Sequence, residues 1–233
     1  MIEYKNRELW TYFFTKPRSY YNKYMYEMVN YPDYLIFDRE EIENNKSKWN
    51  EVYDNKNTDI YLEIGSGSGN FSIELAKRNP NVNLLCDELR LKRLVYSARK
   101  AKKEDLKNIK YIKYDANNLT DFLSENEISG LYINFPDPWT GQEHKRMLGE
   151  KLLENLDVVL KKNGKIFFKT DHDNYYESVV ELINKSDKYE IVVKTDDLYS
   201  NEKLLENNIQ TEFEHLFIHK LKIKIKYIEI IKL

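Results

Sequence analysis

From about residue 60 onward, the chain alternates short apolar runs with segments of helical periodicity, and this alternation limits the possible folds most strongly. The apolar runs predict strands at 60–64, 83–86, 111–114, 130–134, 165–170 and 190–194. Helical spacing predicts helices at 70–78, 89–103, 145–160 and 174–183, the third ending at Asn163-Gly164. The closing stretch 216–233 alternates apolar residues with lysine, which predicts a half-exposed strand. Together these segments predict an α/β fold with a doubly wound, mostly parallel sheet.

The length of 233 residues suits one large domain, and the composition narrows its class. The one cysteine, Cys86, excludes an intramolecular disulfide and a cysteine-based zinc cluster. No run approaches the roughly 20 apolar residues that a membrane helix requires, and the first residues lack a signal-peptide pattern. We therefore expect a cytoplasmic protein that does not contact a membrane.

We expect two parts, an N-terminal arm with an acidic connector at 1–44 and a main domain at 45–233. Residues 4–26 interleave five Lys or Arg with aromatic side chains. This pattern suits stacking on exposed RNA bases, and it suits equally well the packing of an amphipathic arm on the domain. Although the net charge is −2, residues 88–113 hold ten Lys or Arg against three acids, and this stretch is a candidate for phosphate contact.

A glycine-rich turn follows the first predicted strand of the main domain. Glycines at 65, 67 and 69 let the backbone approach a ligand closely before a helix begins. The spacing differs from the dinucleotide fingerprint G-x-G-x-x-G, which counts against a nicotinamide oxidoreductase. Glu63, two residues before the first glycine, can face the ammonium group of a ligand.

Acidic residues also follow the next two predicted strands. The second strand ends at Asp87-Glu88, about 20 residues beyond the glycines, where a carboxylate suits the hydroxyls of a ribose. The third ends at Asp115, which can accept a hydrogen bond from an adenine amino group. Because such a site would repel a pyrophosphate, it favours S-adenosylmethionine over NAD or ATP.

The fourth strand leads into the string Asn134-Phe135-Pro136-Asp137-Pro138-Trp139. Two prolines around one aspartate fix the backbone and hold the carboxylate in a preset orientation. Asp137 is therefore the strongest candidate for a catalytic residue.

From about Asn45 onward, the chain resembles the tRNA (guanine-N7-)-methyltransferases of the bacterial single-chain type, and several of the motifs described above carry this resemblance. The resemblance implies a seven-stranded Rossmann-like sheet. It also implies methyl transfer from S-adenosylmethionine to N7 of the variable-loop guanine, position 46, of tRNA. The strings that carry it, in the order of the family, are Lys48-Trp49, the segment 63–69, Asp115-Ala116, the segment 134–139, Lys169-Thr170-Asp171 and the segment 211–214.

The resemblance also implies roles for single residues. It assigns S-adenosylmethionine contacts to Glu63, Glu88, Asp115 and Asp137, beside the glycine loop with Gly65 and Gly67, and it places Asp137 in the active site. It assigns contacts with the tRNA guanine to Asp171, Thr211, Glu212, Phe213 and Glu214.

Two departures from the family pattern affect these assignments. Gly141 stands where the family has a substrate-contacting lysine, so Lys145 and Arg146 are the candidates to replace that contact. The second strand ends in Cys-Asp-Glu, and we assign the ribose contact to Glu88, with Asp87 as the alternative.

Guanine N7 has a lone pair and no proton, so the transfer needs no general base. We expect Asp137 and Asp171 to orient the base and to stabilise its developing positive charge. We expect neither a metal site nor an obligatory protein partner. Two other classes stay open, an amino-group methyltransferase of the N-P-P-Y kind and a non-catalytic tRNA-binding protein with the same fold.

Overall fold

The computed structural model describes residues 22–233. Most of the basic and aromatic arm predicted at 4–26 lies outside the described residues. Within them, no helix has the length and the apolar character needed to cross a membrane.

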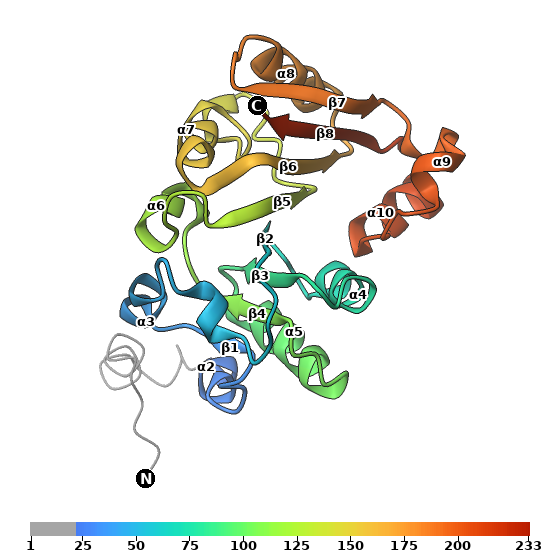
Figure 1. Ribbon diagram of the computed structural model, residues 1–233. Coiled ribbons are helices and arrows are strands. Elements are labelled where there is room, and N and C mark those ends of the chain that lie inside the picture. The colour runs from blue at the N-terminus through green and yellow to red at the C-terminus, as the bar shows by residue number, and fades with distance from the viewer. Residues whose placement is uncertain (1–21) are drawn as a thin grey trace.

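One twisted sheet of eight strands organises the chain (Figure 1). The order across the sheet is β1-β4-β3-β2-β5-β6-β8-β7, and all neighbours are parallel except β8, which runs antiparallel to both β6 and β7. The strands are β1 (Leu35–Ile36), β2 (Ile60–Ile64), β3 (Asn83–Asp87), β4 (Ile109–Ile112), β5 (Ile128–Asn134), β6 (Leu160–Thr170), β7 (Tyr189–Thr195) and β8 (Lys226–Lys232). The predicted α/β class and the mostly parallel sheet are confirmed.

The sheet has eight strands where we expected seven, because the predicted connector contributes a strand. Leu35–Ile36 pair with Tyr111 and Ile112 of β4, so β1 forms the edge next to that strand.

Helices cover both faces of the sheet (Figure 1). The helices α4 and α5 pack on one face, with α2 against α5, and α6, α7 and α8 pack on the other. Their bounds are α2 (Lys23–Met28), α3 (Arg39–Asn44), α4 (Asn70–Arg78), α5 (Leu91–Lys103), α6 (Leu119–Phe122), α7 (Glu150–Val159), α8 (Asp173–Asn184), α9 (Glu202–Leu205) and α10 (Glu212–Leu216).

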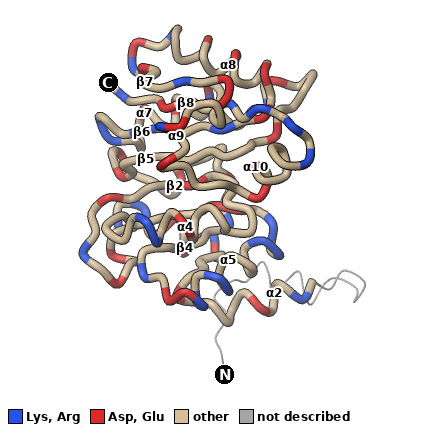
Figure 2. The backbone as a smooth tube through the Cα atoms, turned by 90° about the vertical axis from the view of Figure 1, so that its right-hand side faces the viewer, with Lys and Arg blue, Asp and Glu red and all other residues tan. Residues whose placement is uncertain are grey.

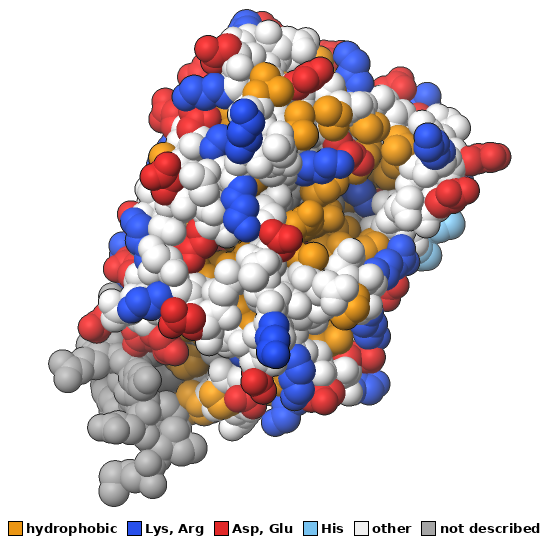
Figure 3. Space-filling view, in the orientation of Figure 1, with side chains coloured by type: hydrophobic (Ala, Val, Ile, Leu, Met, Phe, Trp, Pro, Cys, Tyr) orange, Lys and Arg blue, Asp and Glu red, His pale blue; other side chains and the backbone are white. Residues whose placement is uncertain are grey.

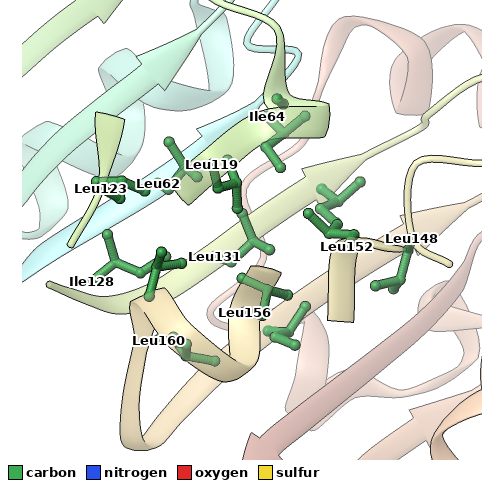
Figure 4. Close-up of a cluster of buried hydrophobic side chains, with 14 of the residues drawn as sticks. Leu62, Ile64, Leu119, Leu123, Ile128, Leu131, Leu148, Leu152, Leu156 and Leu160 are labelled. Carbon is green, nitrogen blue, oxygen red and sulfur yellow. The ribbon is translucent and has the colours of Figure 1, made fainter. Parts of the chain in front are cut away.

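Each face of the sheet has its own apolar core. In the core under α6 and α7, leucine and isoleucine side chains from β2, β5 and α7 interdigitate (Figure 4). Leu62, Leu131 and Leu156 have no exposed surface there. Each such side chain stabilises the fold by about 1.5–3 kcal/mol, which lets the core hold the strand ends in place.

Two predicted elements are present, but their predicted bounds were wrong. The helix predicted at 145–160 begins only at Glu150, after the extended Gly149, and it ends at Val159 because Leu160 pairs with Ile128 of β5. Asn163 lies inside β6, with a positive φ of +63°, and does not end the helix.

The strand predicted at 216–233 was also wrong in its first half. Leu216 is the last residue of helix α10, a π-helical turn follows at Phe217–Leu221, and β8 begins only at Lys226. A capping box between Thr211 and Glu214 begins the helix, and this local signal overrides the alternation of apolar residues and lysine.

The strand order reverses between β2 and β5, and in such sheets ligands bind at the carboxyl ends of the strands next to this point. The glycine turn follows β2, the acidic pair ends β3, and the proline-flanked aspartate follows β5. The fold therefore collects the predicted site residues at one edge.

Candidate active site

A cavity of about 760 Å³ opens at this edge, a volume typical of sites for cofactor-sized ligands. The space-filling view shows the surface hollowed beside α10, with hydrophobic side chains exposed in the hollow (Figure 3). Among the residues that line the cavity are these predicted site residues: Glu63, Gly65, Gly67, Glu88, Asp115, Asp137, Lys145, Arg146, Thr211, Glu212 and Phe213. Gly141, Asp171 and Glu214 are not among the lining residues.

The glycine turn has the backbone conformation that its sequence predicts. Gly65, Gly67 and Gly69 all have positive φ, of +73°, +58° and +77°. A Cβ atom at Gly69 would lie 2.7 Å from Oγ of Ser97, whereas Gly65 has open space around it. Gly69 therefore serves close packing against α5, and Gly65 leaves room for a ligand.

Lys100 of α5 supports this turn. Its ammonium group donates a hydrogen bond of 2.7 Å to the carbonyl of Ser68 and contacts Oδ1 of Asn70. Lys100 is thus engaged with the protein and is not one of the free cations that the basic stretch 88–113 suggested.

Glu63 lies on the cavity wall in an electrostatic setting that suits a cation. Its side chain is 4% exposed, and Oε2 has no hydrogen-bond partner among the described residues. Burial raises the pKa of Glu63 to about 7, although polar neighbours such as Asn134, 3.5 Å from Oε1, oppose the shift in part. An ammonium group placed here would satisfy the orphaned oxygen and compensate the buried charge.

Glu88 and Asp87 differ in what they contact. Oε2 of Glu88 accepts a hydrogen bond from the amide of Gly67 at 3.0 Å, and Oε1 accepts one from the amide of Arg90 at 2.8 Å. Glu88 therefore lies against the glycine turn and retains acceptor capacity for ribose hydroxyls. Asp87 accepts a hydrogen bond from the amide of Tyr114, and burial raises its pKa well above the usual range.

Asp115 is exposed at the cavity, and one of its oxygens is occupied by local structure. Oδ1 accepts hydrogen bonds from the amide of Asn117 at 3.0 Å and from its side chain at 2.8 Å. The second oxygen keeps its capacity to accept a hydrogen bond from an adenine amino group.

The segment 134–139 is held in a strained conformation. Phe135 and Trp139 have positive φ, of +52° and +44°, which side chains rarely adopt. The amide of Phe135 donates to the carbonyl of Lys169 at 2.9 Å, and Arg146 donates to the carbonyl of Pro138 at 2.9 Å. These contacts hold the loop from both ends and leave Asp137 exposed at the cavity.

The two predicted replacements for the missing lysine have different surroundings. Lys145 is exposed, and its ammonium group lies 5.1 Å from the centre of the Trp139 ring. Arg146 is 9% exposed and also bonds Ser178 at 2.8 Å and Asn174 at 2.6 Å. Apart from a contact with the exposed side chain of Gln142, Lys145 faces solvent and can reach a substrate, while Arg146 holds the loop against α8.

The segment 211–214 divides in the same way. Thr211, Glu212 and Phe213 reach the cavity, and Phe213 is 44% exposed. The centre of its ring lies 6.1 Å from that of Phe217, in a stacked arrangement, and 6.4 Å from that of Phe135. The three rings form an aromatic cluster beside the cavity. Glu214 has no exposed surface and faces Lys169.

The residues that sequence reasoning missed belong to the support of this site. Lys169 was noted only as part of a motif, and Lys100 was counted only within the basic stretch 88–113. Tyr199 and Asn208 carried no recognisable signal. Residues 22–233 contain no group of three His, Cys, Asp or Glu side chains arranged to hold a metal ion.

The doubly wound sheet, with a glycine turn and acidic strand ends around one cavity, defines the class of S-adenosylmethionine-dependent methyltransferases. A family model described as "Putative methyltransferase" matches residues 57–226. The tRNA (guanine-N(7)-)-methyltransferase of a Geobacillus species is 36% identical over 196 residues, covering 83% of this chain and 86% of the relative. The chain belongs to the tRNA (guanine-N(7)-)-methyltransferase family.

Two further likenesses concern longer or more distant proteins. A bifunctional glycosyltransferase/methyltransferase of Fusobacterium nucleatum is 49% identical over 232 residues, and the chain spans 36% of that protein's length. The crystal structure of the 16S rRNA methyltransferase KamB superimposes with a TM-score of 0.59 at 16% identity, covering 84% of this chain and 94% of the other. At this identity the likeness to KamB concerns the fold alone.

Proposed function

We propose that the protein transfers a methyl group from S-adenosylmethionine to N7 of a guanine in tRNA. The observation that carries the proposal is the buried Glu63 with an unpartnered oxygen, in a cavity of suitable size that the glycine turn and Glu88 also line. Membership of the tRNA (guanine-N(7)-)-methyltransferase family supports the substrate and the atom that is methylated.

The residues of the cavity match the groups of S-adenosylmethionine by chemistry. Glu63 would pair with the ammonium group, Glu88 would accept from the ribose hydroxyls, and Asp115 would accept from the adenine amino group. When bound, S-adenosylmethionine supplies a methyl group on a sulfonium, and the carbon–sulfur bond breaks as N7 forms its new bond to carbon. S-adenosylmethionine has no phosphate, so these acidic residues would not repel it.

The chain contributes to the transfer by positioning and by electrostatics. Because the N7 lone pair attacks without loss of a proton, no side chain has to act as a base. Asp137, held by the strained loop, would orient the purine and stabilise the positive charge that it gains. Alignment of the reacting atoms contributes about 7–11 kcal/mol in well-oriented reactions. Asp171 does not line the cavity, so it can help to orient the purine only if the tRNA extends to the end of β6.

We further propose that the methylated guanine is the one at position 46 in the variable loop. The exposed ring of Phe213 and the cation of Lys145 lie at the cavity, where an extruded base and its phosphate would meet the protein.

The test is nucleoside mass spectrometry of tRNA incubated with the protein and isotopically labelled S-adenosylmethionine. We expect labelled 7-methylguanosine, and we expect none from a transcript in which guanine 46 is replaced by adenine. A label on an exocyclic amino group would identify the other methyltransferase class. Binding of tRNA with no label transferred would identify the non-catalytic alternative.

A further inference from the structure

We propose that Lys169 and Glu214 form a positioning pair that holds the segment 211–213 across the cavity for tRNA. In this role Glu214 acts through its neighbours and does not touch the substrate. The proposal rests on the proposed function, since it assigns a role in binding the same tRNA.

The pair is buried where the last part of the chain meets the sheet. Nζ of Lys169, at the end of β6, lies 3.1 Å from Oε2 of Glu214 and donates to the carbonyl of Ile209 at 3.0 Å. It also contacts the side chain of Asn208. The side chain of Lys169 is 7% exposed and that of Glu214 is fully buried.

Both carboxylate oxygens of Glu214 have hydrogen-bond partners within the protein. Oε1 accepts hydrogen bonds from the hydroxyl of Tyr199 at 2.9 Å and from the side-chain amide of Asn208 at 2.7 Å. Oε2 accepts one from the amide of Thr211 at 3.2 Å, in addition to Lys169. Because the protein occupies both oxygens and buries them, Glu214 presents no group to a substrate.

The segment that the pair holds is too short to keep its own position. The helices α9 and α10 have four and five residues, and isolated helices of this length do not form in water. Thr211, Glu212 and Phe213 nevertheless line the cavity, and the carboxylate of Glu212 contacts the side chain of Asn70 at the start of α4. The segment thus extends from the end of β6 to the helix that follows the glycine turn.

Lys169 also supports the opposite wall of the cavity. Its backbone carbonyl accepts a hydrogen bond from the amide of Phe135, and the Phe135 ring lies 5.5 Å from that of Phe217. Lys169 therefore contacts both walls of the cavity. Its backbone carbonyl holds the loop that carries Asp137, and its ammonium group holds the segment that carries Phe213. Glu214 touches only one of them, so changes at Glu214 test the proposal most cleanly.

A double substitution can distinguish a positioning role of the pair from a role in stability alone. An apolar pair of similar volume often replaces a buried ion pair without loss of stability, whereas removing one partner destabilises strongly. The double variant Lys169→Met/Glu214→Leu therefore restores packing while it removes the directional contacts to Tyr199, Asn208 and Thr211.

The experiment compares the wild-type protein with the Glu214→Gln variant and the double variant, each as the full-length chain. Each is measured for S-adenosylmethionine affinity by calorimetry, tRNA affinity by filter binding, and kcat and KM for tRNA. We expect KM for tRNA to rise by about tenfold or more in both, with S-adenosylmethionine affinity changed by less than about threefold. Val179→Ala, in the core below α8, serves as a control that lowers stability without touching the cavity.

A KM for tRNA at the wild-type value in a folded Glu214→Gln or double variant would overturn the proposal. Tyr199→Phe removes one hydrogen bond to Glu214 and should raise KM less, so it supplies the comparison if the other variants do not fold. Amide hydrogen exchange measures how firmly the pair holds the segment, and it does not depend on catalytic activity. We expect residues 211–216 of Glu214→Gln to exchange at least about tenfold faster while β8 stays unchanged.

These measurements separate the two proposals. If the wild-type protein binds S-adenosylmethionine but methylates no tRNA, the proposed function fails. Unchanged exchange at 211–216 in Glu214→Gln, by contrast, overturns the positioning pair whatever the activity of the wild type.

Discussion

Replacing Glu63 with glutamine is expected to stabilise the ligand-free protein at alkaline pH. The carboxyl group is buried in the cavity wall, and burial raises its pKa to about 7 from an ordinary value of 4.5. At pH 8 the folded wild-type protein must therefore hold a buried, largely uncompensated negative charge. Glutamine has nearly the same shape, and it carries no charge at any pH.

The magnitude follows from the pKa shift. Since each pKa unit corresponds to about 1.4 kcal/mol, a shift from 4.5 to about 7 changes the unfolding free energy by about 3 kcal/mol. The folded-state pKa is the higher one, so the favourable contribution of protonated Glu63 is fully present below pH 4.5. It is lost as the pH rises through about 7.

Urea unfolding followed by circular dichroism, from pH 5 to pH 8, measures this effect. The unfolding free energy of Glu63→Gln minus that of the wild type should widen from less than about 1 kcal/mol at pH 5 to about 3 kcal/mol at pH 8. Burial also raises the pKa of Asp87, but that group is present in both proteins and cancels in the difference. A difference that does not change with pH would refute the reasoning.

The same carboxyl group should make S-adenosylmethionine binding depend on pH. Only ionised Glu63 can pair with the ammonium group, so the affinity of the wild type should be about 25-fold lower at pH 5.5 than at pH 7.5. Glu63→Gln should bind more weakly at pH 7.5 and lose this dependence. If Asp87→Asn removes it instead, the titrating group has been misassigned.

Three further predictions concern the rest of the site. Glu88→Ala should weaken S-adenosylmethionine binding by about 1–3 kcal/mol in calorimetry, since it removes an acceptor for the ribose and frees the amide of Gly67. Lys145→Ala should weaken tRNA binding at unchanged melting temperature, whereas Arg146→Ala should lower the melting temperature, because it removes the hydrogen bonds to Pro138 and Ser178. Reversing the exposed lysines 220 and 222 to glutamate should weaken tRNA binding. It should also reduce the slope of log affinity against log salt concentration by about 0.7–0.9 for each phosphate that is no longer neutralised.

Each of these has a result that contradicts it. Unchanged affinity in Glu88→Ala, with weaker binding in Asp87→Ala, would move the ribose contact to Asp87. Equal effects of both substitutions on melting temperature would contradict the division between Lys145 and Arg146. For the lysine pair, the control is the reversal of Lys92 and Lys103 on α5, where basic and acidic positions lie close together (Figure 2). A larger decrease in tRNA affinity in this control would place tRNA on α5.

The basic stretch on α5 shows why charge counts along the chain mislead. Arg99 pairs with Glu27 of α2, and Arg93 lies 3.6 Å from Glu88. Lys100 donates to the glycine turn, and Lys110 contacts the carbonyl of Asp33, so several of the ten basic side chains already contact other parts of the protein.

The sequence by itself determined the alternation of strands and helices and the residues at the strand ends. The reason is local: a strand of four or five apolar residues, a turn that needs positive φ at glycine and a proline-flanked aspartate are each encoded within a few positions. A parallel sheet then brings consecutive strand ends to one edge, which is why Glu63, Glu88 and Asp137 meet at one cavity.

Only the tertiary structure decided which of the motif residues face the ligand and which support the site. Glu212 and Glu214 stand two positions apart in one motif, yet one lines the cavity and the other is buried against Lys169, 45 residues away. Arg146 and Lys145 are adjacent and differ in the same way. The capping box between Thr211 and Glu214 is a local pattern, but burial and the contacts with Lys169, Tyr199 and α8 depend on segments distant in the sequence, which no local pattern encodes.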